Sequence, residues 1–457
     1  MKWCADLEDI LRKDPEISLA YLYGTQVDKL PHLINKKPKL FSTAYRLLMF
    51  IGRQLRSLSL NRTPCRPDAK ITVLAFAGTE NQMASLVSTI DAVENKGNHV
   101  LVLCSKSVKK SDMARDEYVE YRFSILDVLK SWILLLRRVT KLHSELKHVH
   151  VFTKKKYFDQ FLNSYTFLVY FYGLLEKIKP EYVMIANDHN VSTRCLLVVA
   201  NFLRIKTIYI QHASVSSVFP PLRMSYAFLD GQAALDIYKE CELNDYGRGE
   251  EEPLPEIFLT GQKKETKCVV GSDNCVGVAI NALDNPERVI DLVANIVEAG
   301  KYVYFRWHPA QQVSEVDFYK EAFGKNAKVV ISDPALCSTS EYISHISSLV
   351  AGNSSIHLEA ALAGVSVIYY ESSNEDLFDY YGYVKNGVSK HAKSIAELLA
   401  ILDCKDSDVL PDKCRLKYYS ETYGTAWQGQ EGRLVAECLI ELSAGKAPSE
   451  IFGWTSY

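Results

Sequence analysis

Short apolar runs alternate along the chain with longer stretches in which apolar residues recur every three to four positions. The first runs, ITVLAFAG and NHVLVLCS, lie at residues 71–78 and 98–105, and the stretch between them has helical spacing and ends at a glycine. A strand, a helix and a second strand in this order predict a parallel sheet with right-handed crossovers. The pattern repeats where EYVMIAND and KTIYIQHA flank the helical stretch NVSTRCLLVVANFLRI.

The alternation stops at residues 244–267, where charged residues, Pro and Gly replace it and indicate a domain boundary. It restarts with CVGVAINAL, PERVIDLVANIVEAG, KYVYFRWHP and AKVVISD. We therefore predict an α/β protein with two tandem Rossmann-like, doubly wound domains. The expected division is a helical N-terminal extension at residues 1–68, a first domain at 69–250, a linker at 251–274, a second domain at 275–425, and a closing helix and tail at 426–457.

Composition agrees with this architecture and narrows the class of protein. A chain of 457 residues with 47% hydrophobic and 24% charged residues is typical of a soluble globular protein of two domains. The eleven cysteines form no CxxC pair, so we expect reduced packing residues instead of a disulfide framework or a zinc site. The sequence contains no signal-peptide pattern and no apolar run long enough to span a bilayer. A cytoplasmic protein is the expectation.

Charge is distributed unevenly although the net charge is only −2. Residues 1–250 carry 35 Lys and Arg against 26 Asp and Glu, and the remaining residues carry 18 against 29. A basic first half could face an anionic partner, such as the cytoplasmic face of the inner membrane or an acidic glycan. Solvated helix faces are the simpler interpretation. No recognised nucleic-acid-binding motif accompanies these residues, so nucleic acid is not an expected partner.

Polar residues that directly follow apolar runs are the candidate functional residues, because ligands of doubly wound sheets bind at the carboxyl ends of the strands. In SLVAGNSSIHLEAALAG, the turn Asn353-Ser354-Ser355 lies between a predicted strand and a predicted helix. A helix N-terminus and serine hydroxyls together suit a phosphate group, and Glu359 one turn later could accept from ribose hydroxyls. The alternative is that a serine only caps the helix.

A second candidate is YFRWHPAQ, where a strand runs into a loop. Pro309 restricts His308 to an extended conformation, and strand alternation places Arg306 on the same face. The imidazole and the guanidinium could therefore bind one phosphate group together.

Three further positions are candidates for chemistry in the first domain. Asp188 and His189 follow the strand YVMIA, where a carboxylate can act as a general base or a nucleophile, although Asn and Asp also cap helices. Gln211 and His212 end the next strand, and Asp230 ends the apolar segment SYAFLD, so His212 and Asp230 are alternative catalytic groups. Glu80, after the first strand, is a weaker candidate for an acceptor or sugar contact, together with His189 and Gln211.

Several common enzyme motifs are missing from the chain. There is no GxGxxG after a strand, no GxxxxGK[ST] and no GxSxG, which disfavours a dinucleotide-dependent dehydrogenase, a P-loop nucleotidase and an α/β-hydrolase. We expect a metal-independent protein, with no metal site and no cofactor beyond a nucleotide-sugar substrate.

With QHA and FLDG late in the first predicted domain, RWHP early in the second and GNSSIHLEAALAG near its end, the chain resembles GT-B glycosyltransferases. The resemblance is to bacterial enzymes that build capsule and lipopolysaccharide, including those that transfer Kdo or sialic acid from CMP-sugars. It covers residues 70–440 in layout, but its motifs are short. It implies a metal-independent transferase that takes a nucleotide sugar, with a CMP-linked donor favoured, and a glycan or glycolipid acceptor.

The same resemblance implies roles for individual residues. Arg306, His308, Asn353, Ser354 and Ser355 would hold the donor phosphate, and Glu359 would contact the ribose. Asp188 would be the acidic group at the anomeric carbon, with His212 and then Asp230 as alternatives. Fixed donors at the helix N-terminus would stabilise the charge on the leaving phosphate, and closure of the two domains would exclude water.

The chain also departs from these families. QHASV stands where polymerases that use CDP-glycerol have His-Gly-Thr-Pro, and FLDG is the nearest match to the acidic motif of sialyltransferases. The alternatives are therefore a CDP-glycerol-type polyol-phosphate transferase, a UDP-sugar transferase, a nucleotide-sugar 2-epimerase, or a non-catalytic nucleotide-sugar-binding assembly protein. An epimerase would need several carboxylates around the sugar, and Asp188 and Asp230 are the first-domain candidates.

Overall fold

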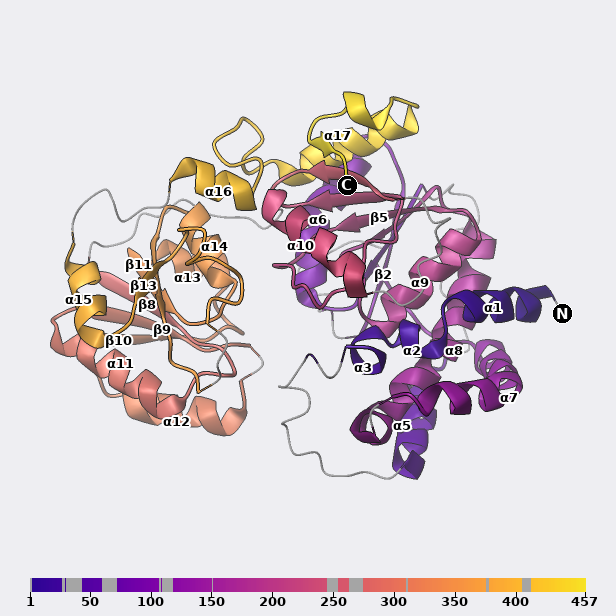
Figure 1. Ribbon diagram of the computed structural model, residues 1–457, viewed down its shortest axis with the longest axis horizontal. Helices are drawn as coiled ribbons and strands as arrows, with labels where there is room; N and C mark the ends of the chain where they lie inside the picture. Colours follow the sequence, from indigo (N-terminus) through magenta and orange to yellow (C-terminus); the bar gives the residue numbers. More distant parts are fainter. Residues whose placement is uncertain are drawn as a thin grey trace. The chain divides into compact units, whose positions relative to one another are not determined.

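The computed structural model of the protein describes residues 2–26, 29, 43–59, 72–106, 108, 118–149, 151–244, 254–262, 274–309, 311–374, 378–404 and 412–457 (Figure 1). The chain forms two compact units. The first consists of Met1–Asp230, Ala234–Lys263 and Gln430–Tyr457, and the second of Gly231–Ala233 and Lys264–Gly429. Each unit is built on one sheet and is described separately below.

The first unit contains an eight-stranded sheet in the order β14-β7-β6-β5-β4-β1-β2-β3, parallel except for β14. Its strands are β1 (Val73–Ala77), β2 (Val100–Cys104), β3 (Tyr118–Glu120), β4 (Tyr182–Ile185), β5 (Lys206–Ile210), β6 (Tyr226–Leu229), β7 (Glu256–Leu259) and β14 (Trp454–Thr455). The central strands are buried along their whole length, because helices cover both faces of a parallel sheet.

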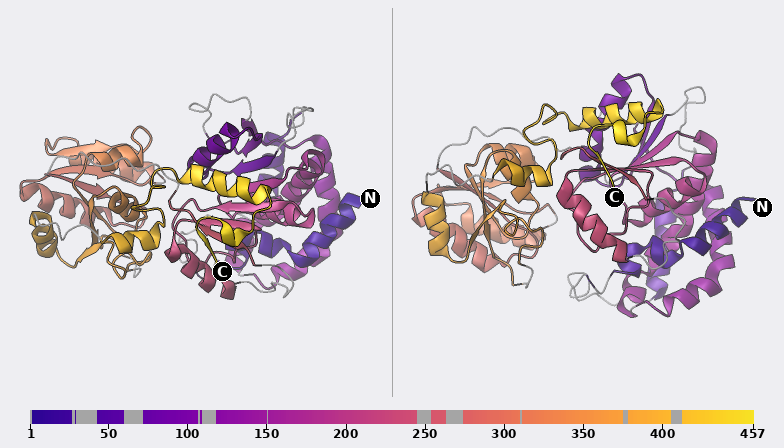
Figure 2. Two further views of the ribbon diagram at one scale, coloured as in Figure 1. Left: turned by 90° about the horizontal axis from the view of Figure 1, so that it is seen from above. Right: turned by 45° about the horizontal axis from the view of Figure 1, so that its top comes forward.

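Helices of the first unit come from widely separated parts of the chain. They are α1 (Lys2–Lys13), α2 (Glu16–Leu19), α3 (Tyr21–Gly24), α5 (Thr43–Arg56), α6 (Glu80–Asn95), α7 (Ile125–Leu146), α8 (Val151–Ile178), α9 (Val191–Phe202), α10 (Gln232–Cys241) and α17 (Glu431–Ser443). The N-terminal helices share one hydrophobic core with the sheet, through residues such as Leu7 and Phe50. Near the other end of the chain, α17 returns to pack against α6 (Figure 2).

The second unit contains a six-stranded parallel sheet in the order β10-β9-β8-β11-β12-β13. Its strands are β8 (Cys275–Ala279), β9 (Tyr302–Arg306), β10 (Val329–Ser332), β11 (Ser348–Ala351), β12 (Ser366–Tyr370) and β13 (Lys390–Ala392). Its helices are α11 (Pro286–Glu298), α12 (Val313–Phe323), α13 (Thr339–Ser344), α14 (Ile356–Leu362), α15 (Ile395–Asp403) and α16 (Lys413–Tyr419). Strand alternation divides the core in two, since Leu349 packs on one face of the sheet and Val350 on the other.

The predicted fold class, two Rossmann-like α/β domains with helices at the N-terminus, is confirmed. One segment differs from its prediction, because residues 254–262 of the expected linker include β7, which pairs with β6 along the sheet. A four-residue strand behind two prolines carries too little apolar pattern to be recognised. Residues 251–253 and 263–273 of that linker lie outside the described residues. Among the residues that are described, no helix is both long enough and apolar enough to cross a membrane.

Candidate functional site

Each sheet has one place where its strand order reverses, and both are flanked by residues predicted to be functional. The first sheet reverses between β1 and β4, and the second between β8 and β11. In open α/β sheets, ligands bind in the crevice outside the carboxyl ends of the strands at such a switch point. The segments to inspect are therefore Gly78–Glu80 and Asn187–Asn190 in the first unit, and Asn281–Asp284 and Asn353–Ser355 in the second.

The turn after β4 is held by Asn187. Its side-chain oxygen accepts hydrogen bonds from the backbone N–H groups of His189 and Asn190, each at 3.1 Å. Asn190, the first residue before α9, makes no side-chain cap of its own. Helix capping at this turn is thus performed by Asn187, and the Asp188 carboxylate is not used for it.

Asp188 is a buried carboxylate with one unused oxygen. It is 3% exposed, and its Oδ1 lies 3.3 Å from Nδ1 of His189. Its Oδ2 is buried and has no hydrogen-bond partner among the described residues. An unsatisfied buried acceptor of this kind costs about 1–3 kcal/mol, so a hydroxyl group that enters and donates to Oδ2 gains that interaction. The geometry suits a group that receives a proton from a substrate.

His189 orients this carboxylate. Its Nε2 lies 2.9 Å from the side-chain amide nitrogen of Asn187, which is a donor, so Nε2 accepts and Nδ1 carries the proton given to Asp188. Its ring also packs on Phe219, with centroids 4.4 Å apart. His189 was predicted as a sugar contact, and the structure shows both ring nitrogens engaged in positioning Asp188.

The other first-unit candidates lie on the neighbouring strand ends. Gln211 accepts from the backbone N–H of Asp230 at 2.9 Å and donates to the carbonyl of Ala213 at 3.0 Å, so it ties the end of β5 to the end of β6. His212 is partly exposed and Asp230 is buried. Since β4, β5 and β6 are adjacent, Asp188, His212 and Asp230 end three neighbouring strands.

A buried tyrosine pair beneath these carboxylates escaped the sequence analysis. The hydroxyl of Tyr238 donates to the hydroxyl of Tyr209 at 2.8 Å. Burial, reinforced by the negative charges of Asp188 and Asp230, raises the pKa of Tyr209 well above its usual value, so the phenol stays protonated. In the sequence Tyr209 belongs to an apolar run and Tyr238 to a stretch of mixed polarity, and only the tertiary structure shows them next to the carboxylates.

A cavity of 440 Å³ opens at the first switch point. Its walls combine guanidinium groups, side-chain amides, hydroxyls and aromatic rings from seven parts of the chain: Tyr23, Arg53, Arg56, Gly78, Ser105, Tyr121, Gln160, Asn163, Phe167, Asn190 and Ser192. Glu80 is exposed; it is the first residue of α6 and lies two residues after Gly78. Aromatic faces and hydrogen-bonding groups around a volume of this size suit a sugar unit.

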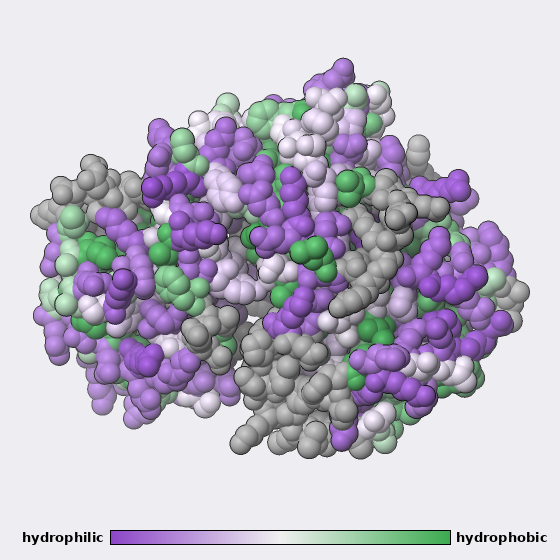
Figure 3. Space-filling view, viewed as in Figure 1, coloured by the Kyte–Doolittle hydropathy of each residue, from purple (hydrophilic) through white to green (hydrophobic). Residues whose placement is uncertain are grey.

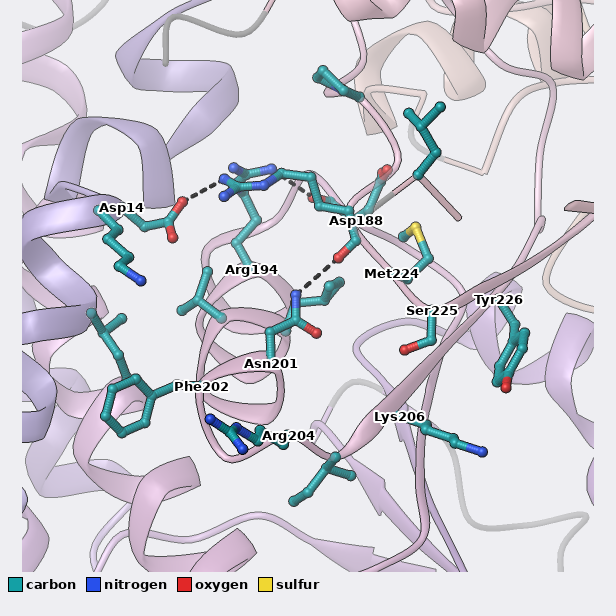
Figure 4. A pocket seen from close by; sticks show the side chains of 18 of the residues that line it. Asp14, Asp188, Arg194, Asn201, Phe202, Arg204, Lys206, Met224, Ser225 and Tyr226 are labelled. Carbon is teal, nitrogen blue, oxygen red and sulfur yellow. Dashed lines mark hydrogen bonds and ion pairs between the residues drawn. The ribbon is translucent and has the colours of Figure 1, made fainter. Parts of the chain in front are cut away.

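A larger cavity, of 560 Å³, runs along α9 toward the amino ends of β5, β6 and β7, where Lys206, Tyr226 and Glu256 begin those strands (Figure 4). Arg194 and Asn201 project into it from α9, and Asp188 lies at one end. Arg223 is held there by Asp14, at 2.5 Å. This cavity was not predicted, because its lining comes from loops and strand starts that carry no motif.

In the second unit, Asn353 holds two loops together. Its carbonyl accepts from the Asn281 side chain at 3.0 Å, and its side-chain oxygen accepts from the backbone N–H of Tyr380 at 2.8 Å. Ser355 precedes α14 and makes no side-chain cap, while the Ser354 hydroxyl is a long 3.5 Å from the N–H of Ile356. The serine side chains therefore contribute little to the capping of α14. Glu359 lies in the first turn of α14 and is partly exposed.

His357 fixes this turn from inside the unit and was not predicted as a functional residue. Its Nε2 lies 2.9 Å from the carbonyl of Gly352, and its Nδ1 lies 3.0 Å from the Ser389 hydroxyl. Complete burial lowers the pKa of His357 to about 4, so the ring is neutral, with Nε2 donating and Nδ1 accepting. The histidine of GNSSIHLEA thus positions the turn and does not face a ligand.

Arg306 and His308 occupy different environments. The Arg306 guanidinium is buried, donates to the Ser332 hydroxyl at 3.0 Å and to the Cys337 carbonyl at 2.9 Å, and lies over the ring of Tyr342. His308 lies in the loop after β9 and is more exposed than Arg306, although desolvation of its ring by the surrounding protein still lowers its pKa. His308 is thus the more accessible of the two predicted phosphate ligands, and Arg306 supports the end of the strand.

Asp284 is a second buried carboxylate, found only in the structure. It is 6% exposed, its Oδ2 accepts from the backbone N–H of Asn281 at 2.7 Å, and its Oδ1 is buried without a partner among the described residues. Burial, assisted by the nearby Glu371, raises the pKa of Asp284 to about 7. A Cβ placed on Gly352 would lie 3.3 Å from Oδ1, so Asp284 borders the predicted phosphate turn directly.

Comparison with known proteins identifies the fold. No family model and no curated protein sequence matches the chain. Among solved structures, it is similar to a UDP-N-acetylglucosamine 2-epimerase, with 15% identity over 85% of this chain and 100% of the other and a TM-score of 0.51. It is also similar to MnaA of S. aureus bound to UDP, with 11% identity over 82% and 97% and the same TM-score.

The chain is also similar to a structure from Listeria monocytogenes that has been assigned as a UDP-N-acetylglucosamine 2-epimerase. The identity is 13% over 84% of this chain and 99% of the other, with a TM-score of 0.50. At these identities the similarity establishes the fold alone. That fold is GT-B, as predicted from the sequence. The predicted CMP-linked donor receives no support from these comparisons.

Proposed function

We propose that the protein is a glycosyltransferase that moves a sugar from a nucleotide-activated donor to a glycan acceptor. The observation that carries the proposal is Asp188, a buried carboxylate at the switch point of the first sheet, oriented by His189 and left with an unpartnered oxygen. A scaffold or a purely structural protein has no use for such a group, because leaving it unsatisfied destabilises the fold.

In the proposed reaction, the bond between the anomeric carbon and the donor phosphate breaks, and the nucleotide leaves with the bonding electrons. The acceptor hydroxyl forms the new glycosidic bond and passes its proton to Oδ2 of Asp188. This role as general base implies inversion at the anomeric carbon, whereas attack by Asp188 itself would imply retention. His212 and Asp230, on the neighbouring strand ends, are the alternative bases.

The second unit would hold the donor nucleotide. His308, Ser354 and Ser355 would donate hydrogen bonds to the phosphate, and Glu359 would accept from the ribose hydroxyls. These donors are fixed before the reaction, Ser354 and Ser355 by the turn that His357 and Asn353 hold. Preorganised donors stabilise the charge that develops on a leaving phosphate.

A UDP-sugar 2-epimerase is the second candidate, and the similarity in fold to UDP-N-acetylglucosamine 2-epimerases favours it. Such an enzyme inverts the configuration at C2 of the sugar and uses no acceptor. Asp188, His212 and Asp230, which end adjacent strands, would then supply the proton-transferring groups. The CMP-linked Kdo or sialic acid donor and the capsule or lipopolysaccharide acceptor inferred from the sequence stay predictions, which the same experiment tests.

The test is a thermal-shift panel with CMP, CDP, UDP, GDP and ADP, followed by incubation of the corresponding nucleotide sugars with the protein. A ligand that binds only the folded protein raises its melting temperature by mass action, so the correct nucleotide stands out. Nucleotide release that requires an added glycan, and stops in Asp188→Asn, supports transfer. Conversion of UDP-N-acetylglucosamine to its C2 epimer without an acceptor establishes the second candidate. No nucleotide response refutes both.

A further inference from the structure

Large apolar side chains are exposed along two neighbouring helices of the first unit. On α7 they are Ile125, Leu126, Leu129, Ile133, Leu136 and Val139, and on α5 they are Tyr45, Leu48 and Leu55. Leu136 is 69% exposed and Leu48 is 65% exposed. We call these nine residues the α5–α7 face. In the view of Figure 3, hydrophilic residues cover most of the coloured surface, and hydrophobic residues are scattered among them.

The spacing of these residues makes a continuous stripe on each helix. On α7, Leu129, Ile133 and Leu136 are separated by four and three positions, so they project from the same side of the helix. The other α7 members, Ile125, Leu126 and Val139, lie three or four positions from one of these. On α5, Tyr45 and Leu48 are three positions apart, and Leu55 follows Leu48 after seven positions, or two turns. The opposite side of α7 is already used, because Leu134, Leu135 and Leu142 are buried in the core. Each helix therefore has two apolar sides, of which one is buried in the protein's own core and the other is exposed.

Direct contacts hold the two helices side by side. The indole N–H of Trp132 donates to the side-chain oxygen of Gln54 at 3.0 Å, and the Gln54 amide donates to the Ser131 hydroxyl at 3.1 Å. The rings of Phe50 and Trp132 pack with centroids 5.7 Å apart. The α5–α7 face thus belongs to two helices that are in direct contact. Apolar surface gathered in this way marks an interaction site, whereas single exposed leucines do not.

Charge around the face indicates the kind of partner. The sequences of α5 and α7 together contain seven Lys and Arg against two Asp and Glu. Four of the cations are paired with carboxylates of other helices, Arg46 and Arg53 with Asp159, Arg137 with Glu8 and Arg138 with Glu16. Arg56, Lys130 and Lys141 are not among these pairs. Lys141 is exposed on α7, and Lys130 lies over the ring of Trp3, 5.3 Å from its centroid. Beside α7, a cavity of 400 Å³ is lined by the cations Lys2, Arg122, Lys130 and Lys177, together with Asp127 and Glu176. The partner is therefore expected to be anionic.

We propose that the α5–α7 face docks on the surface of a bilayer that contains anionic lipid. Helices with an apolar side and basic flanks lie in the membrane interface, with the apolar side buried at the boundary of headgroups and acyl chains. Anionic headgroups attract each nearby Lys or Arg in addition. A second copy of this chain would instead bring two basic surfaces together, which opposes self-association.

This docking surface adds to the proposed function without depending on it. The helix α5 that carries Leu48 and Leu55 also contributes Arg53 and Arg56 to the 440 Å³ cavity of the first unit. If that cavity receives the acceptor, docking would bring it to a lipid-borne glycan. Vesicle binding requires no donor, acceptor or turnover, so the two proposals can fail separately.

The experiment is co-sedimentation of the full chain with vesicles of phosphatidylcholine, with and without phosphatidylglycerol. We expect binding to the anionic vesicles that weakens at high salt, and little binding to phosphatidylcholine alone. The variant Leu129→Ser/Ile133→Ser/Leu136→Ser should lower the partition coefficient at least about 30-fold. The matched control is Val313→Ser/Val330→Ser/Leu336→Ser, which removes three exposed apolar side chains of the second unit and should bind as the unchanged protein does.

A second variant, Lys141→Glu, tests the electrostatic part without touching the apolar stripe, and should weaken binding to anionic vesicles about tenfold. Absence of binding by the unchanged protein would overturn the proposal, as would equal binding by the triple variant. Light scattering after size exclusion, without lipid, supplies the remaining test. A dimer that the same triple variant converts to a monomer would assign the face to a protein interface instead.

Discussion

His189 donates its Nδ1 proton to Oδ1 of Asp188 across 3.3 Å, while the other carboxylate oxygen, Oδ2, faces no donor among the described residues. The pair resembles a general base in its resting state, in which one oxygen is oriented by the protein and the other is not used by it. Asn187 completes the arrangement by fixing the histidine tautomer. The Asp188–His189 pair leads to the most direct test of the proposed chemistry.

Asp188→Asn should abolish transfer and leave nucleotide binding unchanged. Loss of a general base lowers turnover by about 10²–10⁴-fold, whereas the donor nucleotide is proposed to bind on the other unit. Turnover with the donor that the nucleotide panel selects, and a melting-temperature shift with the nucleotide, measure the two effects. Glu181→Gln, which removes an exposed carboxylate just before β4, is the control. Normal turnover by Asp188→Asn would transfer the role of base to His212 or Asp230.

His308→Ala should weaken nucleotide binding by about tenfold, the usual effect of losing one hydrogen bond to a charged group. Burial of the ring lowers the pKa of His308, so the imidazole is neutral at pH 7 and gains a charge only in more acidic solution. Affinity of the unchanged protein for the nucleotide should therefore rise in acidic solution, and the variant should not show this rise. His345→Ala, at an exposed histidine of the same unit, is the control. Unaltered affinity in His308→Ala would remove it from the phosphate site.

Asp284→Asn should stabilise the second unit at neutral and alkaline pH. The folded pKa of Asp284 is about 7, above the ordinary value of 3.8, so the folded state holds a proton that the unfolded state has lost. The stability of the folded state then falls as the pH rises from 4 to 7, by a contribution on the order of 4 kcal/mol. The asparagine keeps an acceptor for the N–H of Asn281 without ionising. Hydrogen exchange of amides in β8 and β11, measured at pH 5 and pH 8, resolves this unit, and an unchanged pH dependence would contradict the assignment.

His357→Leu should loosen the turn at Asn353–Ser355, because Gly352 and Ser389 lose their buried hydrogen-bond partner. We expect a loss of about 2–4 kcal/mol in the stability of the second unit, together with weaker nucleotide binding. The pKa of about 4 has the opposite consequence to that of Asp284. The unfolded state takes up a proton on this histidine near pH 6.5, whereas the folded state keeps the ring neutral down to about pH 4. The stability of the folded state therefore falls as the pH falls from 6.5 to 4. In His357→Gln, which can still donate to Gly352, the turn should be largely restored while the acid sensitivity disappears.

Sequence patterns located the strand ends but did not reveal what surrounds them. Asp188 was found because a polar residue directly follows a buried strand, and this places it at the carboxyl edge whatever the remaining structure. Arg306 was assigned to the correct strand face, yet that face packs on Ser332 and Cys337, and alternation alone cannot tell a ligand from a packing partner. Asp284 and Tyr238 acquire their environments from segments far away in sequence. No local pattern predicts such environments.

The course of the chain through the two units has a consequence for how the protein is made. Apart from Gly231–Ala233, the second unit is a single segment inserted into the first, which closes only when α17 packs on α6 and β14 pairs with β7. Gly453 is needed at this closure, since a Cβ there would lie 2.4 Å from the carbonyl oxygen of Leu259. During synthesis the inserted unit is therefore complete before the first one. The edge of β7 that pairs with β14 stays unpaired until β14 has been synthesised.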